Sequence, residues 1–160
     1  MELSIMTEEK IFEIAKELIP KAQPAYFSTI DENGEPWVRA VENMRNPQVF
    51  PHECKILIEH DDSITPYINT NTSSNKVKHI LENTSAAIYY CSPTEWKGIM
   101  IRGPVEIITD MDFKKKLWRK EMLQYYKKGY TDPDFTILKL HPKHLKSWYT
   151  GKHFELKLSE

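Results

Sequence analysis

The sequence is poor in cysteine. Its two cysteines, Cys54 and Cys91, stand alone, without the paired spacing that marks zinc sites or redox motifs. We therefore expect two reduced thiols in a cytoplasmic protein. The chain also lacks an apolar run close to the roughly 20 residues of a membrane-spanning helix. Its first residues are typical of neither a signal nor a transit peptide, so no membrane association is predicted.

An excess of charge of one sign is also missing. Lysine and arginine number 22, aspartate and glutamate number 23, and the formal net charge is -1. This balance gives no global field that attracts nucleic acid, which we do not expect as a partner. The basic run at residues 114–116 is interpreted as a solvated helix face. The six histidines are dispersed, without a His-x-x-x-His pair, and no metal site is predicted.

What the chain does contain is clear hydrophobic periodicity. Its 160 residues fit one domain spanning 1–160. Apolar residues at 11, 14, 15, 18 and 19 follow a helical repeat, for which Thr7 is the expected N-cap and Pro20 the end. The period then changes to that of strands at residues 25–30 and 37–41. The Asn33-Gly34 pair between them predicts a hairpin turn.

The remaining elements complete a mainly β pattern. Further strands are predicted at residues 55–59, 67–70, 86–91, 98–108 and 135–140, and the apolar residues near 148–149 and 154–158 finish the chain. A short helix follows Lys76, and a longer one runs from its cap at Asp110 to about Tyr126, with Gly129 beyond its end. A doubly wound sheet needs a helix after nearly every strand, and these are missing. The expected fold class is therefore α+β, a barrel with flanking helices.

The strongest candidate for chemistry is the polar segment 70–76. It places hydroxyls, amides and a lysine where a strand ends and a helix begins. The first turn of a helix has unpaired N–H groups and partial positive charge, which together bind phosphate readily. Ser73 or Ser74 can cap the helix or donate to a phosphate oxygen, and Lys76 adds a charge. The alternative is an ordinary serine cap beside a solvated lysine.

A second candidate is Arg39, in the middle of the strand 37–41. Alternation places it on the same face as Trp37 and Val41. An arginine between apolar neighbours on a barrel face requires an anionic partner or access to water. The alternative is an exposed strand face or an ion pair with a glutamate.

Taken together, these motifs resemble a known family. The stretches Arg39-Ala40-Val41, Tyr67-Ile68-Asn69-Thr70-Asn71 and Ser74-Asn75-Lys76, with residues 129–138 and Trp148, are similar to the pyridoxamine-phosphate-oxidase-like flavoproteins. Within that superfamily the chain looks most like the bacterial general stress proteins. The resemblance implies a six-stranded antiparallel split β-barrel with flanking helices. It also implies a homodimer that holds FMN in clefts at the subunit interface.

The same resemblance implies a set of cofactor contacts. The flavin phosphate would lie against an arginine, hydroxyl groups and a lysine, and the backbone at Val41 and Glu42 would run along the ring. Trp148 is assigned to the cleft, with packing in the core or dimer interface as the alternative. The predicted cofactor-binding residues are Arg39, Ala40, Val41, Glu42, Asn69, Thr70, Ser74, Asn75, Lys76 and Trp148.

Departures from the oxidase pattern restrict the activity. Asn75 stands where the oxidases have a second arginine, Met44 where they have a lysine, and Gly98 where a glutamine touches the ring. The Arg-x-His substrate motif and the Arg-Leu-x-Pro ending have no counterpart. We therefore expect an FMN-dependent oxidoreductase acting on an unknown small-molecule electron donor or acceptor, not on pyridoxamine phosphate. A non-catalytic flavin carrier or sensor is the alternative, and no catalytic residue is assigned.

Overall fold

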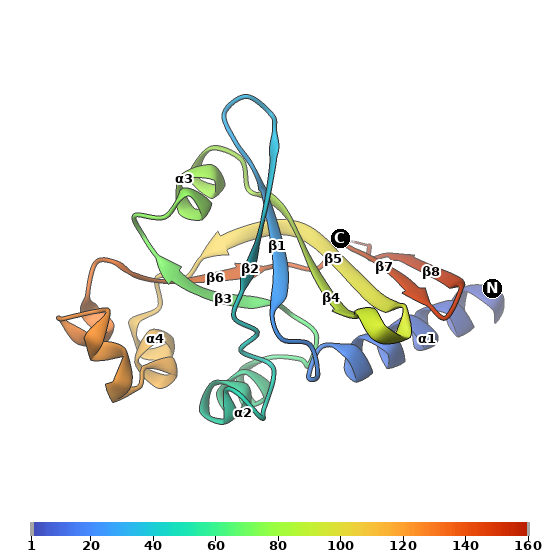
Figure 1. Cartoon of the computed structure of the whole chain (residues 1–160), viewed down its shortest axis with the longest axis horizontal. Helices are drawn as coiled ribbons and strands as arrows, with labels where there is room; N and C mark the ends of the chain where they lie inside the picture. Colours follow the sequence, from blue (N-terminus) through green and yellow to red (C-terminus); the bar gives the residue numbers. More distant parts are fainter. Residues whose placement is uncertain (1, 160) are drawn as a thin grey trace.

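The computed structural model describes the backbone of residues 2–159 and the side chains of residues 7–159. Its strands all pair antiparallel, in a curved sheet (Figure 1). They are β1 (Ala25–Ile30), β2 (Pro36–Val41), β3 (Tyr67–Asn71), β4 (Ser85–Ser92), β5 (Lys97–Ile107), β6 (Phe135–Leu140), β7 (His144–Tyr149) and β8 (Lys152–Lys157). Six of them follow the order β2-β1-β4-β5-β6-β3, and the β7–β8 hairpin branches from β5. The predicted six-stranded split barrel is confirmed.

The split arises along the long strand β5. One edge of β5 pairs with β4, whereas the other edge pairs with β7 over residues 97–102 and with β6 over residues 105–107. Gly103 lies at the change of partner, and a Cβ there would be 1.8 Å from the backbone oxygen of His141. The chain crosses so closely at this point that only glycine fits.

The predicted hairpin of β1 and β2 is also confirmed. Gly34 adopts a φ of +78°, a conformation that glycine reaches without strain. The Asp31 carboxylate accepts hydrogen bonds from the backbone N–H groups of Asn33 and Glu35, both at 2.9 Å. These local interactions fix the register that pairs Phe27 with Arg39.

The helices pack around the sheet. They are α1 (Glu2–Leu18), α2 (Pro51–His60), α3 (Asn75–Glu82) and α4 (Met111–Leu117), with 3-10 turns η1 (Pro93–Glu95), η2 (Lys120–Gln124) and η3 (Gly129–Thr131). α1 packs along the β7–β8 hairpin and β5, and α3 packs against β1 (Figure 1). Ile11, Ile14 and Leu18 of α1 are buried in the main core, as the periodicity predicts. Helix α1 begins well before Thr7, so the prediction that Thr7 is its N-cap was wrong.

Two further element predictions were wrong. Residues 55–59 belong to helix α2, because Pro51 opens a helical turn and Cys54 and Leu57, three apart, are the apolar side chains that become buried. The helix capped by Asp110 ends at Leu117 instead of near Tyr126. Trp118 leaves the helix and packs edge-on against Tyr126 and Phe135.

Helices α2 and α4 form a second, smaller hydrophobic core. Buried side chains of α2 and α4 meet those of β3 and β6, among them Leu57, Phe113 and Ile137. Gly129, expected beyond the end of the long helix, instead opens the 3-10 turn η3 with a φ of +75°. Among the helices of the described residues, none is both long and apolar enough to cross a membrane.

Candidate functional site

The polar segment after β3 forms the N-terminus of α3. Ser74 is the N-cap, and its Oγ accepts a hydrogen bond from the Val77 N–H at 3.5 Å. Thr70, which is buried at the end of β3, donates its hydroxyl to the same Ser74 Oγ at 3.3 Å. Because Ser74 Oγ accepts both bonds, its own hydrogen remains to be donated to a ligand.

The preceding loop is fixed by Asp134. The amide of Asn71 donates to one carboxylate oxygen at 2.6 Å, and the backbone N–H and hydroxyl of Ser73 donate to the other at 3.0 Å. These hydrogen bonds, that of Asn71 first, lower the pKa of Asp134. The Ser73 hydroxyl is therefore bonded to Asp134. Ser74 is the serine that lies at the N-terminus of helix α3.

Arg39 of β2 is half-buried and anchored through one nitrogen. Its Nη1 donates to Thr29 Oγ1 at 2.8 Å and lies 3.1 and 3.3 Å from the backbone oxygens of Trp37 and Phe27. Burial lowers the pKa of Arg39, and no carboxylate of the described residues lies near enough to raise it again. A guanidinium keeps its proton under such conditions, so Arg39 is a cation without an acidic partner there.

Lys76 lies in the first turn of α3 and is also half-buried. Burial lowers the pKa of its ammonium group, and the positive charge of Arg39 lowers it further. Hydrogen bonds also link the two elements, because Arg39 Nη1 bonds Thr29 Oγ1, which lies 2.9 Å from Nδ1 of His79, three residues after Lys76 on α3. These contacts bring the middle of β2 and the first turn of α3 close together.

Apart from Trp148, the other predicted residues belong to β2, β3, the start of α3 and the position directly after β2. Val41 is buried, whereas Ala40, Glu42 and Asn75 are exposed. The Tyr126 hydroxyl donates to Asn69 Oδ1 at 3.5 Å. Burial raises the pKa of Tyr126 to about 12, and the charges of Asp134 and Glu42 add to the shift. Tyr126 therefore stays protonated and remains a donor.

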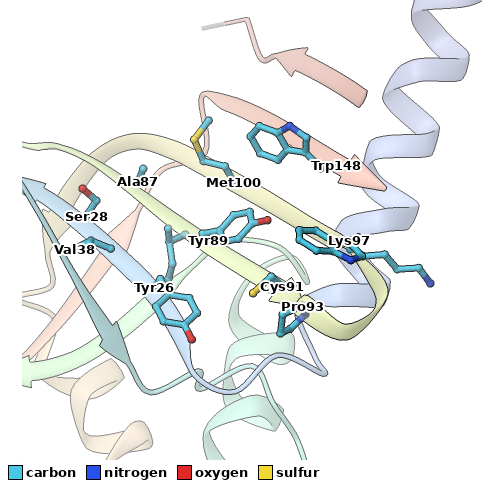
Figure 2. Close-up of a pocket in the computed structure, with 12 residues that line it drawn as sticks. Tyr26, Ser28, Val38, Ala87, Tyr89, Cys91, Pro93, Lys97, Met100 and Trp148 are labelled. Atoms are coloured by element: carbon cyan, nitrogen blue, oxygen red, sulfur yellow. The ribbon is translucent and has the colours of Figure 1, made fainter. Parts of the chain in front are cut away.

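Trp148 lies elsewhere. It stands on β7 opposite Gly98 and lines a cavity of about 750 Å³ on the sheet (Figure 2). Val38 lines the same cavity, and because side chains alternate along β2, Arg39 points to the opposite face. One copy of the chain does not bring Trp148 to the Arg39–Lys76 pair.

The cavity is mostly apolar, and its shape depends on Gly98. Tyr89 and Trp148 meet edge to face with ring centroids 6.2 Å apart. A Cβ at Gly98 would lie 1.9 Å from the Tyr89 hydroxyl, so the absent side chain makes room for that ring. The other lining side chains include Tyr26, Val38, Cys91, Pro93, Trp96 and Met100. Burial raises the pKa of Cys91, so its thiol is a poor nucleophile.

Two residues beneath Arg39 escaped the sequence analysis. Thr29 and His79 are buried, at 0% and 3% exposure, and hydrogen-bond to each other at 2.9 Å. A threonine in a strand and a histidine in a helix carry no sequence signal for such a contact. The face shared by Tyr26 and Val38 was also missed, although alternation in β2 separates Val38 from Arg39 and so indicates a second surface.

Comparison with known proteins gives a consistent picture. A family model described as pyridoxamine 5'-phosphate oxidase matches residues 11–149. Among curated proteins, no sequence matches the chain. A solved structure of a Clostridium acetobutylicum protein, related to general stress protein 26 of Bacillus subtilis and described as of the pyridoxinephosphate oxidase family, has 25% identity and a TM-score of 0.71. The match covers 94% of this chain and 96% of that one.

Two more distant structures share the fold. General stress protein 26 from Bacillus anthracis has 17% identity and a TM-score of 0.66, over 91% of this chain and 97% of that one. A pyridoxamine 5'-phosphate oxidase-related, FMN-binding protein from Nostoc punctiforme has 13% identity and a TM-score of 0.58, over 96% and 95%.

Proposed function

Because its residues 11–149 match the family model, the chain belongs to the pyridoxamine 5'-phosphate oxidase family, and from this premise we propose that it binds FMN by the phosphate. The observation that carries the proposal is the pair Arg39 and Lys76, two half-buried cations, neither of which forms an ion pair with a carboxylate of the described residues. A phosphate dianion would satisfy both charges, and the N–H groups that open α3 would add hydrogen bonds. Ser74 would donate its remaining hydrogen.

The arrangement of Trp148 supports a homodimer with the flavin at the subunit interface. Trp148 faces an open apolar cavity on the side of the sheet opposite to Arg39. A second copy of the chain could present this face to the first. The phosphate would then be held by one subunit, and the ring would lie against Trp148 of the partner subunit. Val38 is 72% exposed, and the second subunit would cover the apolar face around it.

We further propose that the bound flavin makes the protein an oxidoreductase with a small-molecule donor or acceptor. FMN supplies the redox chemistry, and the chain would bind and orient the ring and keep water from one face. Steady-state oxidation of NAD(P)H by the purified flavin-loaded protein, with quinone and nitro compounds as acceptors, tests this role. Turnover supports it, whereas flavin that stays bound without turnover leaves the non-catalytic carrier or sensor.

The phosphate site has its own test. Replacing Lys76 by Ala removes one charge-assisted contact worth about 1.5–3 kcal/mol, so we expect FMN affinity to fall by about 10- to 100-fold in a fluorescence titration. Lys78→Ala is the matched control, because Lys78 is exposed on the same helix and lies 4.0 Å from Glu32. An affinity that stays within about twofold in Lys76→Ala contradicts the placement of the phosphate.

A further inference from the structure

We infer that Thr29 and His79 are positioning residues for the phosphate site, an assignment that rests on the proposed FMN function. Neither residue is assigned a ligand contact; instead, they bond each other and fix the direction of the Arg39 guanidinium. They also tie β1 and β2 to the helix that carries Lys76. Their role is to hold the two cations at a separation that lets both bind the same phosphate group.

The contacts form a continuous chain from Arg39 to α3. Arg39 Nη1 donates to Thr29 Oγ1 at 2.8 Å, and Thr29 Oγ1 lies 2.9 Å from His79 Nδ1. Since the guanidinium can only donate, the hydroxyl oxygen of Thr29 accepts from it. In the tautomer of His79 that carries its hydrogen on Nε2, Nδ1 accepts the hydroxyl hydrogen of Thr29. One hydroxyl therefore serves both neighbours, and each bond orients the other.

The same chain determines which part of Arg39 faces a ligand. The two hydrogens of Nη1 are occupied by Thr29 and by the backbone oxygens of Trp37 and Phe27. Nε and Nη2 have no hydrogen-bond partner among the described residues, and this edge of a guanidinium can bind two oxygens of a phosphate at once. Without Thr29, the side chain would lose its shortest anchor and would sample other rotamers.

His79 carries the restraint to the second cation. It lies on α3 one turn after Lys76, so the two residues share one face of the helix. Its ring is 3% exposed and meets Trp37 of β2 edge to face, with ring centroids 5.3 Å apart. Helix α3 is thereby held against β1 and β2 at the level of Arg39. The hydrogen-bond chain therefore acts on the distance between two like charges, which repel each other until an anion arrives.

The test compares FMN with riboflavin, which has the same ring and no phosphate. Thr29→Val removes the hydroxyl at nearly constant volume, and we expect FMN affinity to fall by about tenfold while riboflavin affinity stays within about twofold. Thr29→Ser restores the hydroxyl and should recover the preference for FMN. Thr65→Val is the matched control, because Thr65 is also buried and bonds Asp62 at 2.8 Å, away from Arg39. A general loss of protein stability would lower the affinities for FMN and riboflavin equally.

His79 and Arg39 provide the second measurement. His79→Leu should lower the FMN-to-riboflavin preference, and His79→Asn, whose side-chain oxygen can accept the Thr29 hydroxyl, should recover it. In an Arg39→Leu background, Thr29→Val should have no further effect on FMN affinity, because the two residues act through one another. If the wild-type protein prefers FMN but Thr29→Val leaves the preference unchanged, or if the effects of Thr29→Val and Arg39→Leu add, the positioning role is wrong. If the wild-type protein shows no preference at all, the proposed function itself fails.

Discussion

At the scale of single residues, the site is defined by a charge imbalance. Arg39 and Lys76 lie close enough that the charge of one lowers the pKa of the other, and both lose hydration to burial. Such a pair is unfavourable on its own and becomes favourable when an anion binds. Neither side chain forms an ion pair with a carboxylate of the described residues, so the pair is recognised by its environment and not by its residue types.

The lowered pKa of Lys76 predicts a pH dependence of FMN binding. The protonated lysine binds phosphate, and burial together with Arg39 lowers its pKa from the ordinary 10.5. As the pH rises through this lowered pKa, the free protein loses the charge, so the affinity falls by up to about tenfold per pH unit. The decline should begin below pH 10.5 in titrations of the wild-type protein.

Lys76→Arg separates this effect from ionisation of the flavin ring. Arginine keeps its charge throughout the range, so the decline that belongs to residue 76 should disappear in this variant. Its affinity at neutral pH can differ, because the geometry of the contact changes. A wild-type profile that runs parallel to the Lys76→Arg profile would show that Lys76 does not charge the site.

At the scale of secondary structure, two glycines of β5 make different demands. A Cβ at Gly103 would meet the backbone oxygen of His141 at 1.8 Å, whereas a Cβ at Gly98 would meet the end of the Tyr89 side chain at 1.9 Å. Backbone cannot move away without breaking the pairing of β5 with β6 and β7, but a tyrosine ring can rotate. An added methyl group should therefore destabilise the fold more at Gly103 than at Gly98.

We expect Gly103→Ala to lower the free energy of unfolding by about 3 kcal/mol or more, and Gly98→Ala by about 1 kcal/mol. Urea unfolding of the flavin-free protein measures both. The comparison is internally matched, because both substitutions add one methyl group to the same strand. Equal losses would mean that the crossing at Gly103 is looser than the distance implies.

The elements also show where sequence patterns are sufficient. The β1–β2 hairpin follows from Asn33-Gly34 alone, and the N-terminus of α3 follows from Ser74, because turn and cap act within a few residues. Residues 55–59 were misassigned because their apolar side chains fit a strand as well as one helix face. Burial against α4 and β3 selects the helix, and that packing is not encoded locally.

At the scale of the whole molecule, the two candidate surfaces lie on opposite faces of the sheet. The Arg39–Lys76 pair lies at the side where α3 packs, whereas alternation along β2 places Val38 and the Trp148 cavity on the other face. Figure 2 shows the side chains that line this cavity. A homodimer would join the two kinds of surface, one from each subunit. Sedimentation of the purified protein tests whether two copies associate.

Val38→Lys should weaken this association by about tenfold or more, because it places a charge in the proposed contact. FMN affinity should fall with it when the flavin lies between subunits. Ile58→Lys is the control, since Ile58 is an apolar residue, 58% exposed, on α2 and outside the Trp148 cavity. Dimers that survive Val38→Lys unchanged would place the interface on another surface.

The sequence by itself determined the local features of this protein: the hairpin, the cap of α3, the buried stripe of α1 and the polar segment 70–76. These depend on propensities and hydrogen bonds between residues near one another in the chain. Only the tertiary structure decided that Arg39 lies near the helix of Lys76, that Thr29 and His79 link the two elements, and that Trp148 faces away. The strand order, the split at Gly103 and the docking of α3 on β1 set those distances, because each depends on packing between segments far apart in sequence.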